Sequence, residues 1–335
     1  MNPVLVEVTR GDMVESRHRG AIAVVRANGQ TMLTVGDTGR LVYPRSAIKP
    51  LQAIYAVESG AAEAFNLTDV ELALACASHN GEPEHVSTVL AWLARLGLGQ
   101  EALECGAHAP RREADWAALV EENLSPGTAH NNCSGKHCGF LSSARYLGLA
   151  TEGYILKEHP IQQAVFGLIG EMADFNLDAT PGGIDGCGIP VAGIPLESVS
   201  LAFARFATGA GLDSRRQAAA QRIYQAMVRE PFMVAGSERW CTRAIQIGKG
   251  AFIVKTGAEG VYCGAVPEIG VGIALKIDDG ASRAAECAMG AVLSGLGCLT
   301  NEQSSDLVGS VILNVAGKKV GRVQPAPEAA DFVLR

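Results

Sequence analysis

The sequence lacks the features that would connect it to a membrane or to nucleic acid. It has no run of about 18 apolar residues, the length that a helix needs to cross a bilayer. It has no run of basic residues either, and 28 Lys and Arg are outnumbered by 35 Asp and Glu, for a net charge of −7. Such an acidic balance disfavours phosphate backbones and anionic lipids. We therefore expect no nucleic acid and no membrane as partners.

A secretion signal is also lacking. The first residues, MNPVLVEVTR, show no basic segment followed by a long apolar one. The nine cysteines are odd in number and irregularly spaced. Without a secretion signal, reduced thiols in a cytosol are a simpler interpretation than disulfides. These observations predict a cytoplasmic protein and count against an exported cell-wall enzyme.

The first two thirds of the chain predict a hairpin followed by helices. Residues 20–37 contain two apolar runs around an Ala-Asn-Gly-Gln turn, which is typical of a hairpin. A helix is predicted to start at Ser46 and to end at Gly60, with Pro50 tolerated in its first turn. Residues 66–244 carry mainly helical spacing, interrupted by Gly- and Asn-rich turns.

The last third changes to the spacing of strands. Strand-like runs begin near residue 250, followed by a helix over 281–297 and a last weak strand over 309–317. We therefore predict an α+β fold whose antiparallel sheet uses both termini, with a largely helical insertion between them. The 335 residues form a single catalytic unit in this interpretation. The sheet-containing parts are approximately 1–65 and 245–335, and the helical part is approximately 66–244.

Three short motifs predict the chemistry. Ser46 and Lys49 form S-x-x-K, Ser78 begins S-x-N, and Lys255 begins K-T-G. In this order they are the signature of active-site-serine hydrolases related to penicillin-binding proteins and class A β-lactamases. A serine hydroxyl is a weak nucleophile until a nearby base, here a lysine made neutral by its surroundings, takes its proton. Alternatively, Ser46 is only a helix cap, Lys49 is solvated, and Lys255 is a charge on an edge strand.

A second group of residues has the composition of a metal site. Two cysteines and a histidine, Cys133, His137 and Cys138, lie within six residues, and Cys187 follows in a Gly-rich turn. Thiolate and imidazole ligands suit zinc, but the spacing alone does not choose among these four. Reduced cysteines packed as small apolar side chains are an equally simple explanation.

Five segments together resemble a known family, the Rhizobium etli type of L-asparaginase, also called asparaginase II or class 3. They are YPRSAIKPLQ, CASHNGE, HNNCSGKHCGF, GIDGCGIP and KTGAEGVY, and they run from residue 43 to 262. The resemblance implies a β-lactamase/penicillin-binding-protein-like fold, a homodimer, and hydrolysis of L-asparagine to L-aspartate and ammonia. It also implies two Ser–Lys pairs, which fall on Ser46 with Lys49 and on Ser78 with Lys255.

The same resemblance implies a zinc ion held by Cys133, Lys136 and Cys187. Lysine is an unusual ligand because its amine must first lose a proton, and its ordinary pKa lies far above 7. Cys138 departs from the family's pattern, in which a small residue such as Ala is more usual. Whether Cys138 adds a ligand, a redox liability or nothing is left open by the sequence.

The substrate-side residues complete the hypothesis. Asparagine carries an ammonium and a carboxylate, so His137 and Asp185 are substrate candidates, with Asp185 facing the ammonium. Arg45 would face the carboxylate or a structural carboxylate. We expect Ser46 to attack the side-chain amide with Lys49 as the base, and Ser78 with Lys255 to relay a proton. A serine glutaminase, a β-lactam-handling enzyme and a non-catalytic zinc-binding protein are the alternatives.

Overall fold

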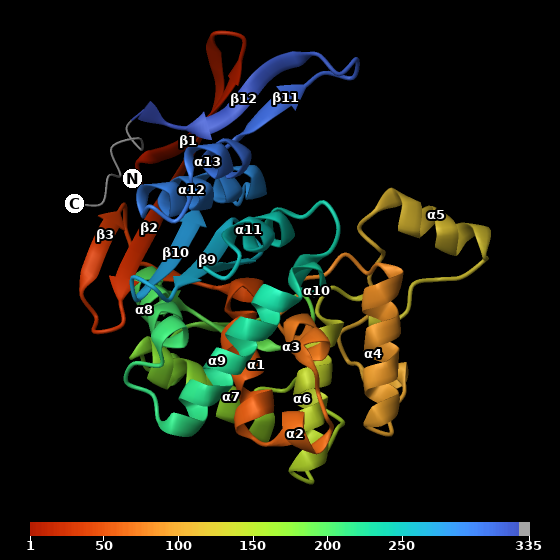
Figure 1. Cartoon of the computed structure of the whole chain (residues 1–335). Coiled ribbons are helices and arrows are strands. Elements are labelled where there is room, and N and C mark those ends of the chain that lie inside the picture. The colour runs from red at the N-terminus through yellow and green to blue at the C-terminus, as the bar shows by residue number, and fades with distance from the viewer. Residues whose placement is uncertain (328–335) are drawn as a thin grey trace.

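The computed structural model describes residues 1–327 as one α+β arrangement (Figure 1). The strands are β1 (Val4–Arg10), β2 (Met13–Arg26), β3 (Thr31–Val35), β4 (Leu41–Val42), β5 (Gly182–Ile184), β6 (Pro190–Ala192), β7 (Ile194–Pro195), β8 (Ile253–Thr256), β9 (Val261–Val266), β10 (Val271–Ile277), β11 (Ser310–Leu313) and β12 (Lys319–Pro325). The helices are α1 (Lys49–Glu58), α2 (Ala61–Ala64), α3 (Asp69–Ala75), α4 (Pro83–Arg95), α5 (Glu113–Glu121), α6 (Ser134–Tyr146), α7 (Pro160–Ala173), α8 (Leu196–Thr208), α9 (Ser214–Arg229), α10 (Pro231–Ala235), α11 (Trp240–Gly248), α12 (Ser282–Gly295) and α13 (Asn301–Leu307). Four short 3₁₀ helices are η1 (Arg45–Ile48), η2 (Gln100–Ala102), η3 (Thr128–His130) and η4 (Leu177–Ala179).

One antiparallel sheet of eight strands is built from both ends of the chain. Its order is β11-β12-β1-β2-β10-β9-β8, with β3 also paired to β2. The 14-residue β2 is long enough to pair with β1 over its first half and with β10 and β3 over its second half. Helices α1 to α11 lie between β3 and β8 in the sequence. The predicted fold class, with a sheet from both termini and a largely helical insertion, is confirmed.

Helices cover both faces of this sheet. A Cβ on Gly272 of β10 would lie 1.9 Å from the Ser200 carbonyl oxygen, so α8 packs directly against the backbone on that face. The neighbouring Ile273 points to the opposite face, because side chains alternate along a strand. There the Ile273 side chain and Met289 of α12 both lie close to Gly264 of β9. The apolar core therefore continues through the sheet into both helical layers (Figure 1).

The structure differs from the sequence prediction in its small elements. The predicted helical part contains the short strands β5, β6 and β7, because the Gly-rich stretch around residues 182–195 forms a hairpin and an edge pair instead of simple turns. Near the C-terminus, α13 and β12 were not predicted. The apolar pattern of β12 is broken by Gly321, whose missing side chain allows close approach to Thr9 of β1. Within residues 1–327, no helix has the length and apolar character that crossing a membrane requires.

The predicted helix at Ser46 is divided into two parts. A 3₁₀ turn, η1, carries Ser46, and the α-helix begins only at Lys49 with Pro50 in its first turn. Arg45 has a φ of 53°, a left-handed conformation that is uncommon for a residue with a side chain. Such strain is characteristic of residues that the surrounding structure holds for function. The predicted hairpin is confirmed as β2 and β3, joined across residues 27–30.

Candidate active site

Lys49 is the first residue of α1, and its ammonium group makes three hydrogen bonds. The side chain is 1% exposed. Its Nζ donates to the carbonyl oxygen of Ala77, to Ser78 Oγ at 3.2 Å, and to the carbonyl oxygen of Asn132 at 3.4 Å. An ammonium has three hydrogens and no lone pair, so these three acceptors match its charged form. Lys49 therefore fixes the Ser78 hydroxyl and holds a positive charge beside it.

Lys255 approaches the same hydroxyl from the sheet. It lies on β8, its side chain is fully buried, and its Nζ is 2.9 Å from Ser78 Oγ. Burial, assisted by the charge of Lys49, lowers the pKa of Lys255 to about 7. Because Ser78 Oγ already accepts from Lys49, its own hydrogen is free to be donated to neutral Lys255. Ser78 therefore connects a charged lysine to one that is poised to exchange a proton.

Ser46 lies at the strained turn before Lys49. It is half-buried, and its hydroxyl makes no hydrogen bond to any residue in 1–327. The glycine of K-T-G brings β8 against this turn. A Cβ on Gly257 would lie 2.7 Å from the Pro44 carbonyl oxygen and 3.1 Å from the Ala47 nitrogen. Only glycine allows this approach, which places the end of β8 beside the residue that carries the free hydroxyl.

A small cavity adjoins Ser46 and contains several of the predicted residues. Arg45, Ser46, Lys49, Lys136 and Asp185 line it, together with apolar side chains. Its volume of about 20 Å³ is room for roughly one water molecule. These groups therefore lie together around a nearly closed space.

Arg45 and Asp185 pair with each other in this cavity. Arg45 Nη2 lies 3.1 Å from Asp185 Oδ1. Burial favours the protonated carboxyl, but the hydrogen bond from Arg45 and the charges of Lys136, Arg45 and Lys49 together lower the pKa of Asp185. The two sequence-predicted substrate residues are therefore charged partners, of the kinds that an amino acid's carboxylate and ammonium would engage.

The predicted zinc ligands also meet. Cys133 and Cys187 are buried, and Lys136 Nζ donates to Cys187 Sγ at 2.9 Å. Hydrogen bonding to Cys187 lowers the pKa of Cys133 well below its ordinary value, with help from the charges of Lys49 and Lys136. Burial opposes the charge on Lys136, but the two sulfurs prevail and raise its pKa. Two sulfurs, one of them a thiolate, therefore converge on one ammonium, which would have to lose a proton to bind zinc, and thiolates are strong zinc ligands.

This donor set fits zinc only if the lysine takes part. Within residues 1–327, no three His, Cys, Asp or Glu side chains form a cluster that could hold a metal ion. Cys138 is fully buried, and burial raises the pKa of its thiol well above the ordinary value. A hydrogen bond with Cys133, together with burial, also raises the pKa of Cys187, but that sulfur contacts both Cys133 and Lys136, whereas the Cys138 thiol makes no hydrogen bond within residues 1–327. The geometry thus favours Cys133, Lys136 and Cys187 over a set that includes Cys138.

His137 is placed differently from the other substrate candidates. It is fully buried and does not line the cavity beside Ser46. Its Nδ1 is hydrogen-bonded to the Tyr154 hydroxyl at 2.6 Å, and the same hydroxyl accepts the Glu104 N–H. Its Nε2 has no hydrogen-bond partner among the described residues. Burial lowers the pKa of His137 well below its ordinary value, so the ring is neutral.

Glu82 supports the site, and the motifs gave it no role. Its buried carboxylate accepts from Asn80 Nδ2 at 3.0 Å, from the Ser237 N–H at 2.7 Å and from Arg112 at 2.7 Å. These bonds tie the segment that carries Ser78 to the start of α11 and to the loop before α5. The only sequence signal was its place at the end of CASHNGE.

The fold and this arrangement define a class of protein. A serine hydroxyl between two buried lysines, with a second serine free on a strained turn, is typical of active-site-serine hydrolases that cleave amides. The family described as L-asparaginase II matches residues 6–325. The chain therefore belongs to the L-asparaginase II family, and it is an amidohydrolase with a small-molecule substrate.

Solved structures show more distant likenesses, and no curated protein matches the chain. A protein named Mglu is 14% identical, with 89% of this chain and 72% of that chain covered and a TM-score of 0.47. A β-lactamase from Mycobacterium bovis is 16% identical over 82% of this chain and 94% of that chain, with a TM-score of 0.43. The D-alanine carboxypeptidase AmpC from Burkholderia cenocepacia is 15% identical over 81% and 93%, with a TM-score of 0.38.

Proposed function

We propose that the protein is an L-asparaginase that hydrolyses L-asparagine to L-aspartate and ammonia through an acyl group on Ser46. The observation that carries this proposal is the Ser78 hydroxyl held between Lys49 Nζ at 3.2 Å and Lys255 Nζ at 2.9 Å. Such a buried unit can hold a proton near neutral pH and return it to a leaving group. Membership of the family supports the choice of asparagine.

Substrate binding uses the Arg45–Asp185 pair. The substrate's carboxylate replaces Asp185 at Arg45, and its ammonium replaces Arg45 at Asp185. Each charge exchanges one partner for another, so the cavity can open without leaving a buried charge unpaired. The opening moves the hairpin of β5, which is exposed, and β6, whose residues 190–192 line the cavity. The side-chain amide is then directed toward Ser46.

The lysines have different roles in this mechanism. Ser46 attacks the amide carbon and transfers its proton into the unit formed by Lys49, Ser78 and Lys255. Neutral Lys255 is the group that accepts the proton, because its pKa of about 7 makes the neutral form available. Lys49 remains charged and keeps the Ser78 hydroxyl aligned. The proton then passes to the departing ammonia, and the same unit later activates water.

Backbone N–H groups stabilise the oxyanion that develops on the substrate. One belongs to Ser46 itself, at the start of η1. The other is the N–H of Ala258, which makes no hydrogen bond within residues 1–327 and follows the glycine that brings β8 against that turn. Fixed donors of this kind lower the barrier because they need no reorganisation during the reaction.

Zinc is the proposed cofactor, held by Cys133, Lys136 and Cys187. The ion would supply a fixed positive charge that orients the substrate's α-substituents. Lys136 lines the cavity beside Ser46, so a ligand at this position lies next to the substrate. The nucleophile does not depend on the metal, because Ser46 fills that role. His137 follows Lys136 on α6 and is hydrogen-bonded to Tyr154.

The experiment measures ammonia release from L-asparagine and from L-glutamine and, in parallel, the absorbance change of a chromogenic β-lactam, whose ring opening releases no ammonia. We expect asparagine to be preferred. The kcat/KM for glutamine should be lower by roughly ten- to two-hundredfold, the discrimination that one methylene group allows in a binding pocket. Glutamine turnover equal to or above that of asparagine would make the protein a glutaminase. Turnover of the β-lactam alone would reject the amidohydrolase assignment for both amino acids.

Two further proposals concern the protein as a whole. We propose a homodimer, on the basis of the family alone, and light scattering of the purified protein tests it. We also propose a cytoplasmic location, which the nine free thiols support because an oxidising compartment would threaten the Cys133–Cys187 pair.

A further inference from the structure

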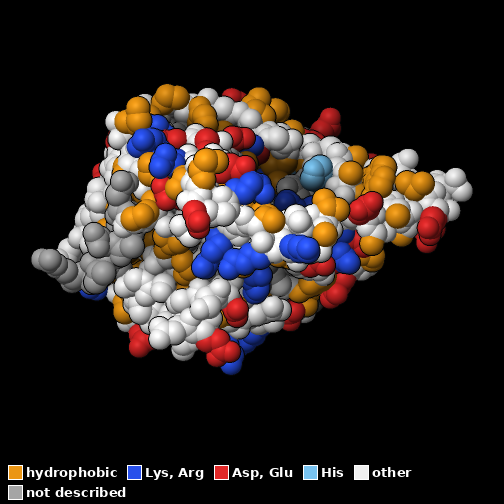
Figure 2. Space-filling model, turned by 90° about the horizontal axis from the view of Figure 1, so that it is seen from above, with side chains coloured by type: hydrophobic (Ala, Val, Ile, Leu, Met, Phe, Trp, Pro, Cys, Tyr) orange, Lys and Arg blue, Asp and Glu red, His pale blue; other side chains and the backbone are white. Residues whose placement is uncertain are grey.

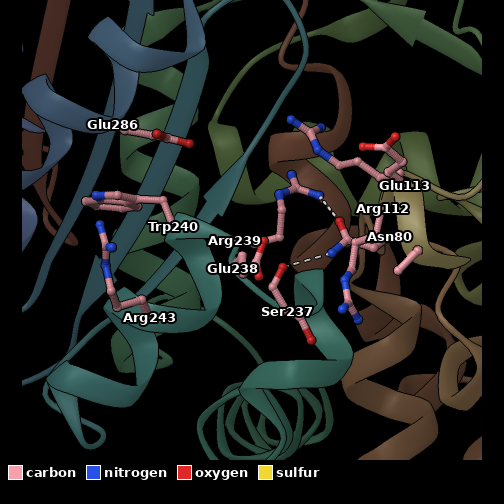
Figure 3. Close-up of a pocket in the computed structure, with 11 residues that line it drawn as sticks. Asn80, Arg112, Glu113, Ser237, Glu238, Arg239, Trp240, Arg243 and Glu286 are labelled. Carbon is pink, nitrogen blue, oxygen red and sulfur yellow. Dashed lines mark hydrogen bonds between the residues drawn. The ribbon is translucent and has the colours of Figure 1, made fainter. Parts of the chain in front are cut away.

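A second and much larger cavity lies on the other side of the Ser78 segment. Its volume is about 590 Å³, and it is lined by the segments around Asn80, Arg111–Ala114 and Ser237–Arg243, with Glu286 of α12. None of these residues lines the cavity beside Ser46. In Figure 3, Asn80 and Arg112 form one wall, Trp240, Arg243 and Glu286 form the other, and Arg239 lies between them. The seven residues that bear charge there are four arginines and three glutamates.

Three of the four arginines of this cavity have no ion-pair partner among the described residues. Arg112 forms an ion pair with Glu82 at 2.7 Å. Within residues 1–327, neither Arg111, Arg239 nor Arg243 forms an ion pair within 4.0 Å. Arg239 instead donates to the carbonyl oxygen of Ser78 at 3.1 Å and to Asn80 Oδ1 at 3.0 Å, which are neutral acceptors. The repulsion is evident in Arg111, whose pKa is lowered chiefly by the charge of Arg239.

The carboxylates nearby do not cancel this charge. Glu113 and Glu238 are exposed to solvent, where their fields are screened. Glu286 is half-buried, and burial raises its pKa despite the attraction of the arginines. In the space-filling view from above, Lys and Arg side chains gather around a hollow near the middle of the face (Figure 2).

The backbone adds to this positive potential. Helix α11 begins at Trp240, and both Trp240 and its N-cap residue Arg239 line the cavity. The helix has no side-chain cap and no acidic residue in its first turn, so its N–H groups lack the partner that capping usually supplies. Trp240 is held in place by donation of its Nε1 hydrogen to the Leu307 carbonyl oxygen at 3.3 Å. This hydrogen bond connects the start of α11 to the end of α13.

We propose that this cavity binds a small dianion, carrying a phosphate group or two carboxylates, between Arg111, Arg239 and Arg243. Planar guanidinium groups match the paired oxygens of carboxylate and phosphate. A dianion suits the site better than a monoanion because it relieves the repulsion of more than one arginine. The site is distinct from the proposed catalytic cavity, and it contacts the catalytic segment through the bond from Arg239 to the Ser78 carbonyl oxygen.

The test is calorimetric titration of the full-length protein with inorganic phosphate and, separately, with succinate. Ionic strength is held constant with sodium chloride, so that chloride acts as the competing monoanion. The informative variants are Arg111→Gln and Arg243→Gln, because both side chains are exposed and make no side-chain hydrogen bond within residues 1–327. Arg215→Gln, an equally exposed arginine at the start of α9, is the matched control.

We expect saturable binding of one dianion per chain at millimolar concentration or below. Each pocket variant should weaken it about tenfold, the usual effect of losing one hydrogen-bonded charge, and Arg215→Gln should not. Binding of phosphate but not succinate identifies a phosphoryl ligand, and the converse identifies a dicarboxylate. The proposal is overturned if neither dianion binds saturably, or if binding is unchanged in both pocket variants, as it would be for an anion held at Arg45.

Discussion

At the scale of single residues, the chemistry depends on how two buried lysines divide one charge. Lys49 has three oxygen acceptors around its Nζ, whereas Lys255 has the Thr256 carbonyl and the Ser78 hydroxyl. A positive charge is therefore better stabilised by hydrogen bonds at Lys49 than at Lys255. Once Lys49 is charged, its field and the burial of Lys255 favour loss of a proton from Lys255. The pair thus provides a base and a fixed charge from two identical side chains.

The first prediction concerns the pH dependence that follows from this division. Neutral Lys255 is the active form, and its pKa is about 7, so kcat/KM for asparagine should rise with pH and level off above this value. Below it, activity should fall about tenfold per pH unit. The measurement is kcat/KM from about pH 5 to 9, with circular dichroism to show that the protein remains folded.

Two controls define the result. Lys157→Met removes an exposed lysine and should leave the profile unchanged, whereas Lys255→Met should abolish activity across the range. A profile that is flat from about pH 6 to 9, or one that falls above about pH 7 while the protein stays folded, would exclude lysine as the base.

The motifs named the four residues that we propose to react, but not their protonation. Ser46, Lys49, Ser78 and Lys255 were all named from three motifs because spacing and order are features of the chain itself. The acceptors that keep Lys49 charged are backbone oxygens of Ala77 and Asn132, and backbone oxygens have no sequence signature. For this reason Lys49 was expected to be the base, while the structure gives the lowered pKa to Lys255.

At the scale of elements, the site is assembled where ends of helices and strands meet. The start of α6 and the turn at residues 185–188 bring Cys133, Lys136 and Cys187 together. Gly135 makes this possible on the other side of α6, since a Cβ there would lie 2.2 Å from the Leu74 carbonyl oxygen of α3. The helix therefore packs closely enough to hold Cys133 beside the Ser78 segment.

The second prediction follows from this meeting of elements. Purified protein should carry about one zinc per chain, and Cys133→Ser or Cys187→Ser should lose it, because thiolates are its strongest ligands. Elemental analysis measures the metal, with Cys287→Ser, a buried cysteine of α12, as the control that retains it. Because Ser46 performs the attack, loss of metal should raise KM more than it lowers kcat. If both cysteine variants retained the metal, Cys133 and Cys187 would not be its ligands.

The third prediction concerns the contact between β8 and η1. Gly257→Ala places a Cβ 2.7 Å from the Pro44 carbonyl oxygen, so the strand must move away from Ser46. We expect a loss of about 1–3 kcal/mol in the free energy of unfolding, measured by urea denaturation, together with a lower kcat. Gly167→Ala in α7, where nothing lies within 4 Å, should be neutral or slightly stabilising. Equal effects of the two changes would show that the close approach of Gly257 to Pro44 contributes neither to stability nor to catalysis.

Large elements were predictable from the sequence, and small ones were not. The first hairpin and helix α12 have long, regular apolar patterns, and the structure contains both. The turn η1 and the strands β5 to β7 are too short for any pattern to show. They are stabilised by long-range contacts instead, as when β4 pairs with β7 more than 150 residues later in the chain. Such contacts position Ser46 and Asp185, so the detailed shape of the site required the structure.

At the scale of the whole molecule, overall charge and local charge differ. A net charge of −7 excludes a generally basic surface, yet unpaired arginines gather in the larger cavity. Arg111 and Arg239 are more than 120 residues apart, so only folding brings them together. The Ser78 segment lies between this cavity and the smaller one beside Ser46. One segment therefore separates the proposed site of reaction from the proposed site for a dianion.

The rate of ammonia release from L-asparagine by Ser46→Ala tests most directly whether Ser46 carries the acyl group. Ser46 is half-buried and its hydroxyl makes no hydrogen bond within residues 1–327, so the variant should fold normally. If Ser46 carries the acyl group, kcat should fall on the order of 10³-fold or more, while Ser87→Ala, an exposed serine of α4, remains active. Near-normal turnover by a folded Ser46→Ala protein would show that Ser46 is not the nucleophile.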